Sequence, residues 1–443
     1  MGADGSLKTH QKTLRVVIVT MDTHLASATQ NAAADLARES PGLRLTMHAA
    51  SEWSASESKR SLCLADIEQA DILIVTMLFL EEHFQPILDA IAAKRGQCDA
   101  VICAMSATEV TTLTQIGDFD MSKPASGPIA LLKKLRGKPS SNETGGEAQM
   151  KMLRRLPKLL RFIPGTAQDV RAYFLTLQYW LGGSRENMAN MVRYLAARYA
   201  GEATREIADR LDACAPPLEY PSVGVYHPRM ELRIADHRHG LPAVKEPKGR
   251  VGLLLLRSYL LGGNAAHYDG VIAALEAQGL EVVPAFASGL DSRPAIEAFF
   301  VRDGQPIVDA IVSLTGFSLV GGPAYNDSAA ASALLESLDV PYLAAHPVEF
   351  QTLDQWGGSE RGLSPVESTI MVAIPELDGA TNPLVFGGRA GAPGVTCEGC
   401  HHRCTFSADD NPQDMHSCPE RALALAARVN KLVQLRRRGR ANR

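Results

Sequence analysis

The chain has 443 residues, of which 46% are hydrophobic, 21% charged and 6% aromatic, a balance typical of a globular protein with two or three domains. Its 45 basic and 49 acidic residues give a formal charge of −4, which excludes a general polyanion-binding protein. No apolar run reaches the ~18–20 residues of a membrane-spanning helix, and the polar start is unlike a secretory signal. We therefore expect a cytoplasmic protein that binds no nucleic acid and spans no membrane.

Positive charge is concentrated in two strips. Residues 121–161 hold ten basic and two acidic residues, and residues 431–443 hold six basic residues and no acidic one. The rest of the chain therefore carries a formal charge of −18. Such strips can contact an acidic partner or an anionic membrane face, although a solvated linker and a frayed tail are the simpler interpretation of each strip alone.

The first 118 residues alternate between short apolar runs and segments with helical spacing. The apolar, β-branched runs are typical of buried strands in a parallel sheet. They lie at residues 14–20, 71–76 and 99–104, and the helical segments lie at 25–40 and 82–95. Because strands alternate with helices, residues 1–118 are expected to form a doubly wound α/β domain.

The next two segments differ in composition from this domain. Residues 119–165 are rich in Pro, Gly, Ser and Lys, which predicts a basic flexible connector with a short helix near 148–161. Residues 166–247 are expected to form a helical hairpin and a linker. Gly183 is placed to end the first helix of the hairpin, and Ser184 to cap the second.

A second α/β domain is predicted over residues 248–385. Its expected strands lie at 251–256, 281–286 and 310–314, with helices near 265–278 and 293–301. The predicted fold class is therefore α/β, with two doubly wound, flavodoxin-like parallel-sheet units joined by a helical segment. Residues 386–443 complete the chain as a Cys-rich loop followed by a basic helix that begins at Pro419.

Four of the eight cysteines lie within 22 residues, in the pattern Cys397-x2-Cys400-x3-Cys404-x13-Cys418. Without a signal peptide, such crowding indicates metal binding rather than disulfides. Four soft thiolates can hold one zinc ion or one [4Fe–4S] cluster. The absence of a second C-x-x-C pair favours the cluster, whereas the neighbouring histidines, His401 and His402, leave zinc open as an alternative.

Three polar stretches contain side chains that can bind a flat anionic macrocycle by stacking and by ion pairing. The candidate substrate-binding residues are His227, Arg229, His346, Glu349, Trp356 and Arg361. On spacing alone, turn-forming His-Pro pairs and a core tryptophan are the simpler interpretation. The sequence has no G-x-x-x-x-G-K-[ST] phosphate loop, so any ATP-driven step requires a nucleotide on another subunit.

Five motifs, in order along the chain, carry a family resemblance. They are FIPGTAQDVR (162–171), YWLGGSREN (179–187), YPSVGVYHP (220–228), RSYLLGGNAAHY (257–268) and VAIPELDG (372–379). Through these motifs the chain resembles the large H subunit of magnesium chelatase. The resemblance extends over essentially the whole chain but covers only the amino-terminal third of that family's polypeptide.

The resemblance implies a porphyrin-binding subunit that takes part in inserting Mg2+ into protoporphyrin IX for chlorophyll and bacteriochlorophyll synthesis. It implies two AAA+-type partner subunits, I and D, that hydrolyse ATP, and a downstream Mg-protoporphyrin methyltransferase as a further partner. It also implies an iron–sulfur cluster on Cys397, Cys400, Cys404 and Cys418, and a peripheral position at photosynthetic membranes.

The resemblance assigns no catalytic residue here, because the family's proposed insertion residues lie in later domains, beyond residue 443. We therefore expect a partial chain that is inactive alone. Two alternatives stay open: a cobaltochelatase large subunit acting on a corrinoid precursor, and a non-catalytic porphyrin-binding or regulatory module.

Overall fold

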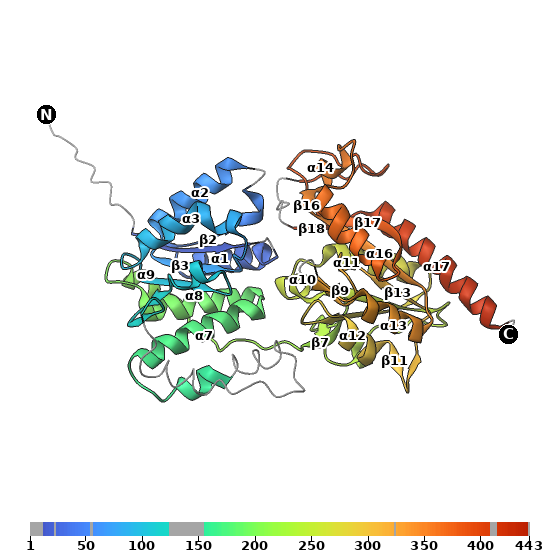
Figure 1. The fold of residues 1–443 in the computed structure, drawn as a ribbon, viewed down its shortest axis with the longest axis horizontal. Coiled ribbons are helices and arrows are strands. Elements are labelled where there is room, and N and C mark those ends of the chain that lie inside the picture. The colour runs from blue at the N-terminus through green and yellow to red at the C-terminus, as the bar shows by residue number, and fades with distance from the viewer. Residues whose placement is uncertain are drawn as a thin grey trace. The chain divides into compact units, whose positions relative to one another are not determined.

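The computed structural model describes residues 12–21, 24–53, 56–123, 155–322, 325–407 and 414–441 (Figure 1). The chain divides into two compact units, Met1–Glu219 and Tyr220–Arg443. Each unit contains a mainly parallel sheet with helices packed on both faces, which confirms the predicted α/β class. Among the described helices, none combines the length and the apolar character that crossing a membrane requires.

The sheet of the first unit has the strand order β2-β1-β3-β4-β5-β6. Its four parallel strands are β1 (Leu14–Thr20), β2 (Leu43–Ala49), β3 (Ile72–Thr76) and β4 (Ala100–Ala104). Two short antiparallel strands, β5 (Gln115–Ile116) and β6 (Phe119–Asp120), extend one edge. The order of the parallel strands is that of a flavodoxin-like doubly wound sheet, as predicted.

Helices cover both faces of this first sheet. The helices that connect its strands are α1 (Ala26–Glu39), α2 (Glu57–Gln69), α3 (Glu81–Lys94) and α4 (Thr108–Thr111), with a 3-10 turn at Ala50–Glu52. Leu36 of α1 is buried on one face of the sheet, and Ile67 of α2 and Ile87 of α3 are buried on the other. The two faces therefore have separate hydrophobic cores.

The helical hairpin consists of α7 (Thr166–Gly182) and α8 (Arg185–Tyr199), and the short α9 (Arg205–Ala208) follows it. As predicted, Gly183 ends α7 in the left-handed conformation, with φ of 60°, and the Ser184 hydroxyl accepts a hydrogen bond from the Asn187 N–H at 3.2 Å.

The hairpin belongs to the first unit and is not the separate segment that was expected. Met188 and Val192 of α8 are fully buried in the core that α1 shares with the sheet, because the apolar face of α8 packs against α1. Arg185 and Arg193 of α8 also form ion pairs with acidic residues of α1. Most of the expected connector, residues 124–154, lies outside the described residues, and residues 155–160 are helical.

The sheet of the second unit has eight strands in the order β18-β17-β16-β13-β9-β10-β7-β8. The five parallel strands are β9 (Arg250–Leu256), β10 (Glu281–Ala287), β13 (Ala310–Ser313), β16 (Tyr342–Thr352) and β17 (Thr381–Arg389). The antiparallel strands are β7 (Val223–Tyr226), β8 (Ile234–Ala235) and β18 (Met415–Ser417). The parallel strands again follow the flavodoxin-like order.

Two expected boundaries in this half of the chain are wrong. Because β7 pairs with β10, the second unit begins at Tyr220 and not at residue 248. Because β17 continues to Arg389 and β18 pairs with it, residues 386–389 and 415–417 are sheet and not loop. The Cys-rich segment is thereby joined to the second unit at both of its ends.

The remaining elements complete the second unit. The helices are α10 (Arg257–Gly262), α11 (Ala266–Ala277), α12 (Arg293–Phe299), α13 (Ser328–Leu338), α14 (Leu353–Gly357), α15 (Pro365–Glu367), α16 (Ile374–Leu377) and α17 (Pro419–Ala441). A π-helical segment spans Ser368–Ala373, and a 3-10 turn spans Arg238–Gly240. Two short hairpins pair β11 (Val301–Arg302) with β12 (Gln305–Pro306) and β14 (Gly321–Gly322) with β15 (Tyr325–Asn326).

Replacing the cap residue of α8 is the first test of this fold. We expect Ser184→Ala to destabilise the first unit by about 1 kcal/mol, because the Asn187 N–H then lies buried without an acceptor. Ser61→Ala, at an exposed position of α2, is the matched control and should change stability by less than about 0.5 kcal/mol. Urea denaturation followed by circular dichroism measures both, and equal effects would contradict the capping role.

A buried histidine gives the second test. His267 is fully buried between the rings of Tyr259, Tyr268 and Phe386, and its ring nitrogens have no hydrogen-bond partner among the described residues. Burial, with a smaller contribution from His416, lowers the pKa of His267 to about 3. Below the ordinary pKa of about 6.5, the unfolded chain therefore binds a proton that the folded chain does not.

The stability of the folded chain should consequently decrease as the pH falls from about 6.5 toward 3. Between pH 7 and pH 5 this single group accounts for about 2 kcal/mol of lost stability. His267→Phe keeps an aromatic ring in place and is expected to remove that part of the loss. Urea denaturation at both pH values compares the two proteins, and the same loss in both would show that His267 does not carry the effect.

Candidate metal centre

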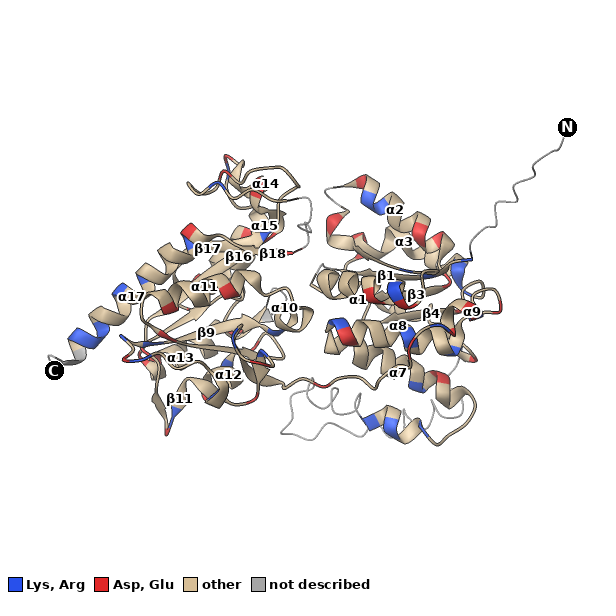
Figure 2. Ribbon diagram, turned by 180° about the vertical axis from the view of Figure 1, so that it is seen from behind, with Lys and Arg blue, Asp and Glu red and all other residues tan. Residues whose placement is uncertain are grey.

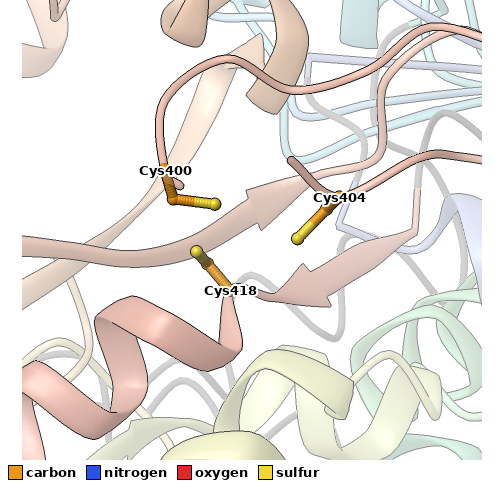
Figure 3. A group of neighbouring side chains, drawn as sticks. All are labelled: Cys400, Cys404 and Cys418. Atoms are coloured by element: carbon orange, nitrogen blue, oxygen red, sulfur yellow. The ribbon is translucent and has the colours of Figure 1, made fainter. Parts of the chain in front are cut away.

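Three thiols converge at the junction between the Cys-rich loop and α17. Cys400 and Cys404 lie on the loop after β17, and Cys418 lies between β18 and α17. Their sulfur atoms all lie within 4.8 Å of one another. Figure 3 shows the three side chains pointing toward a common centre. Because β18 pairs antiparallel with the end of β17, the chain returns to the point where the loop begins. Cys418, which follows β18, therefore lies beside the other two cysteines.

The loop itself is a short hairpin that backbone hydrogen bonds hold in place. Thr396 and Thr405 form an isolated bridge between its two arms, and the Cys397 N–H donates to the Cys404 carbonyl at 2.8 Å. Gly399 at its tip lies against the ring of Trp356, so closely that a Cβ atom there would overlap the ring. Only glycine therefore fits this position without displacement of the tryptophan.

The fourth predicted ligand, Cys397, lies outside the group of three. Its thiol is buried and donates a hydrogen bond to the Leu353 carbonyl, with a distance of 3.2 Å. His401 and His402, the reason that zinc was an alternative to the cluster, also lie outside the group. The His401 ring is 99% exposed and pairs with Glu420 at 2.9 Å, while the His402 backbone N–H donates to the same carboxylate. The structure therefore brings together three of the four predicted cysteines.

The electrostatic environment differs among the three thiols. Burial raises the pKa of Cys418 to about 12 and also raises the pKa of Cys404. Burial acts on Cys400 in the same direction, but a hydrogen bond from Cys418 and backbone N–H groups of residues 402, 403 and 404 outweigh it, so the pKa of Cys400 is lowered. Backbone donors around a sulfur stabilise its thiolate form, which is the form that binds metals.

This donor set fits a metal centre based on thiolates. Thiolates that share one tetrahedral zinc ion, each at about 2.3 Å from it, lie about 3.8 Å apart. Thiolates of a [4Fe–4S] cluster bind different iron atoms and stand farther apart than that. Sulfur atoms within 4.8 Å of one another are closer to the single-ion spacing, and either centre requires a fourth ligand beside these three.

Two of the predicted substrate-binding residues are held by one carboxylate. The His227 ring and the Arg229 guanidinium both contact Glu276, in the last turn of α11, at 3.1 Å and 2.5 Å. His227 is 1% exposed, and burial lowers its pKa. These contacts tie the segment after β7 to α11.

The other four candidates lie at or after β16. His346 is buried in this strand, which lowers its pKa, and the backbone N–H of Glu349 donates to the buried carboxylate of Glu367. Trp356 lies on α14, and Arg361 is exposed in the loop that follows. Three strands separate β7 from β16, which is about 19 Å at the usual strand spacing. The structure therefore does not bring the six candidates to one place.

Trp356 nevertheless belongs to the surroundings of the metal centre. The Arg421 guanidinium on α17 stacks over its ring, with the guanidinium carbon 4.4 Å from the ring centroid. The same guanidinium donates two hydrogen bonds to the Gly399 carbonyl, at 2.9 and 3.3 Å. No local pattern in the sequence marks Arg421, because its two contacts come from residues distant in the chain.

An open groove with a volume of about 660 Å³ borders the metal centre. Its walls are the loop around Cys400 and the exposed face of α17 around Ala424, and Leu384 of β17 also lines it. In many open α/β sheets ligands bind instead at the carboxyl edge of the strands. The cavity at that edge of the second sheet, lined by Leu256, Ala287 and Thr315, offers about 10 Å³, no more than the space of one water molecule.

Comparison with known proteins matches most of the chain to two family models. The family model described as CobN/Magnesium Chelatase matches residues 177–443, and a domain of unknown function (DUF3479) matches residues 15–174. The chain belongs to the CobN/magnesium chelatase family. Both the cysteines and the groove lie in the part that the CobN/magnesium chelatase model covers.

The relatives of this chain include two magnesium-chelatase H subunits. That of Cereibacter sphaeroides is 50% identical over 423 residues, and that of Rhodobacter capsulatus is 48% identical over 422 residues. Each match covers 95% of this chain and 35% of the relative, so the chain spans about a third of their length. The aerobic cobaltochelatase subunit CobN of Pseudomonas aeruginosa is 32% identical over 225 residues, which cover 48% of this chain and 16% of that protein.

The contact between the loop tip and Trp356 provides a third test. We expect Gly399→Ala to destabilise the second unit by roughly 1–3 kcal/mol, because the added methyl group displaces the tryptophan ring. Gly439→Ala, at an exposed position of α17 where an added methyl group meets no neighbour, is the control and should not destabilise the protein. Urea denaturation followed by tryptophan fluorescence measures both variants. Equal stability of the two would contradict the close packing at Gly399.

Proposed function

We propose that this chain is part of a magnesium-chelatase H subunit and takes part in inserting Mg2+ into protoporphyrin IX. The observation that carries this proposal is the 50% identity to a magnesium-chelatase H subunit over 95% of the chain. The cobaltochelatase relative matches only 48% of the chain, at 32% identity. We assign no catalytic residue in this chain.

The chemistry of the reaction explains why such a protein works with partners. Mg2+ holds its water molecules tightly and prefers octahedral oxygen ligands. Insertion therefore requires removal of that water, removal of two pyrrole protons and distortion of a rigid ring. These steps need an enclosed cavity, a base and a source of energy. The sequence contains no phosphate loop, which supports our proposal that ATP is hydrolysed on the partner subunits I and D.

We further propose a peripheral position and a downstream partner. The last turns of α17 carry basic side chains at the exposed positions Arg437 and Arg438, and Figure 2 shows basic residues near its C-terminal end. Such a basic end supports contact with an anionic membrane face. The proposed acceptor of the product is a Mg-protoporphyrin methyltransferase.

For the metal centre, we propose one [4Fe–4S] cluster held by Cys397, Cys400, Cys404 and Cys418. Three converging sulfur atoms, the backbone donors around Cys400 and the position of Cys397 on the same hairpin support it. When bound, the cluster would cross-link the loop to the start of α17. We propose this structural role for it because metal insertion into a porphyrin requires no electron transfer. One zinc ion is the second candidate, which the sulfur spacing within 4.8 Å favours.

Metal analysis of the chain purified without oxygen tests this centre. We expect about four iron atoms per chain and a broad absorption shoulder near ~400 nm that dithionite bleaches, because a cubane on four thiolates requires both. Cys400→Ser and Cys397→Ser should each remove most of the iron. Cys214→Ser, which replaces an exposed thiol of the first unit, is the control and should keep it.

The same preparation distinguishes the two candidate metals. One zinc per chain, retained by Cys397→Ser and lost by Cys400→Ser, would contradict the cluster and indicate a zinc site on Cys400, Cys404 and Cys418 whose fourth ligand is not Cys397. Circular dichroism of each variant shows whether the two α/β units stay folded.

Titration with deuteroporphyrin tests the substrate class. We expect saturable quenching of porphyrin fluorescence by the 443-residue chain, and weaker binding of a corrinoid such as hydrogenobyrinate diamide. No saturable quenching would exclude a role for this chain in porphyrin binding. Tighter binding of the corrinoid would instead indicate a cobaltochelatase.

A further inference from the structure

The groove beside Cys400 has the size of a small-molecule site, since ligand pockets usually measure about 300–1,000 Å³ and this groove measures about 660 Å³. One of its walls is α17, the longest helix of the described residues, with 23 residues. The opposite wall is the loop tip at Gly399 and Cys400. None of the six substrate-binding residues predicted from the sequence lines it.

Three residues of α17 form a stripe along this groove. Arg421, Ala424 and Arg428 are spaced i, i+3 and i+7, so they share one face of the helix. Seven residues at 1.5 Å each place the two arginines about 10 Å apart along the helix axis. Ala424 is exposed between them, and the half-buried Leu384 lines the groove from β17. The stripe therefore presents two cations with the small apolar side chain of Ala424 between them.

Among the described residues, the acidic side chains that line the groove pair with residues other than these two arginines. Arg403 pairs with Glu398 at 3.4 Å, and His401 pairs with Glu420 at 2.9 Å. Within the described ranges, neither Arg421 nor Arg428 forms an ion pair with a carboxylate. Arg421 is instead held in position by the Trp356 ring and the Gly399 carbonyl. A rigid guanidinium of this kind is suited to bind a carboxylate.

We propose that this groove binds a flat apolar molecule with two carboxylates, one at Arg421 and one at Arg428, with Ala424 and Leu384 against its apolar body. The negative charge of a nucleotide or polyphosphate is concentrated on adjacent phosphate groups, so its binding requires cations that converge on one point. These two cations stand about 10 Å apart with apolar surface between them. The inference rests on the proposed function, in which the ligand is a porphyrin whose two propionates supply the carboxylates.

The test uses the 443-residue chain, with deuteroporphyrin as the dicarboxylate and its dimethyl ester as the uncharged analogue. We expect Arg428→Gln to raise the Kd for deuteroporphyrin about fivefold, as the loss of one exposed ion pair predicts. Ala424→Glu should weaken binding further, because it adds bulk and a like charge on the apolar surface. The dimethyl ester should bind more weakly than deuteroporphyrin and be insensitive to Arg428→Gln.

Arg438→Gln is the matched control, since it removes an exposed arginine of the same helix that does not line the groove. It should leave the Kd unchanged. Iron content, zinc content and circular dichroism are measured for each variant. We expect them to stay at the wild-type values, because Arg428 is not one of the converging cysteines or of the residues that hold the loop tip.

Two results would contradict ligand binding in the groove without contradicting the proposed function. One is saturable deuteroporphyrin binding that Arg428→Gln and Ala424→Glu do not change. The other is an equal loss of affinity in Arg428→Gln and Arg438→Gln, which would show a general charge effect. No saturable binding to the wild-type chain would overturn both this inference and the role of the chain in porphyrin binding.

Discussion

The packing of α17 against the second sheet positions one side of the candidate site, from Cys418 to Arg428. Leu425, Val429 and Val433 of this helix are fully buried in the core that it shares with α11. Burial of each such side chain contributes roughly 1.5–3 kcal/mol, so the helix has one stable position on the sheet. Because Cys418 immediately precedes α17, the same packing positions one of the three converging thiols of the candidate metal centre. It also orients Arg421 and Arg428 along the exposed face of the helix.

A second constraint holds the opposite side of the metal loop. Glu367 is fully buried, and its carboxylate accepts hydrogen bonds from the backbone N–H groups of Glu349, Phe350, Gln351 and Ser364. A buried carboxylate is tolerated only when its oxygens are satisfied in this way. The bonds join the end of β16 to α15, and so fix the ends of the segment that carries Trp356. Trp356 then limits how far the loop tip at Gly399 can move.

The sequence predicted those strands whose side chains are buried on both faces. The runs in β1, β3, β4 and β9 are continuously apolar, because neighbouring strands and helices cover them on each side. By contrast, β2 mixes buried and exposed positions, and β17 contains Gly387 and Gly388, which are typical of a loop. Those glycines are required by close packing, since a Cβ at residue 388 would lie 2.7 Å from the Val348 carbonyl.

The candidate site was predictable to the extent that local spacing determines it. The spacing of the cysteines anticipated that Cys400, Cys404 and Cys418 converge, since a hairpin and one return strand suffice to bring them together. The hydrogen bond from Cys397 to Leu353 depends on a segment 44 residues away. The pairing of His227 with Glu276 spans 49 residues. Contacts of this range come from the tertiary fold, and no local pattern in the sequence encodes them.

Arg421 is the residue at which the metal loop and the groove meet. Its guanidinium stacks on Trp356, donates to the Gly399 carbonyl and lines the groove, so the position of the loop tip and the position of this cation are linked. A metal bound by Cys400 and Cys418 would fix the loop tip relative to the first turn of α17. It would thereby fix the width of the groove between them. The proposed metal would then act as a structural cross-link that pre-organises the proposed binding surface, and so would lower the entropy lost when a ligand binds.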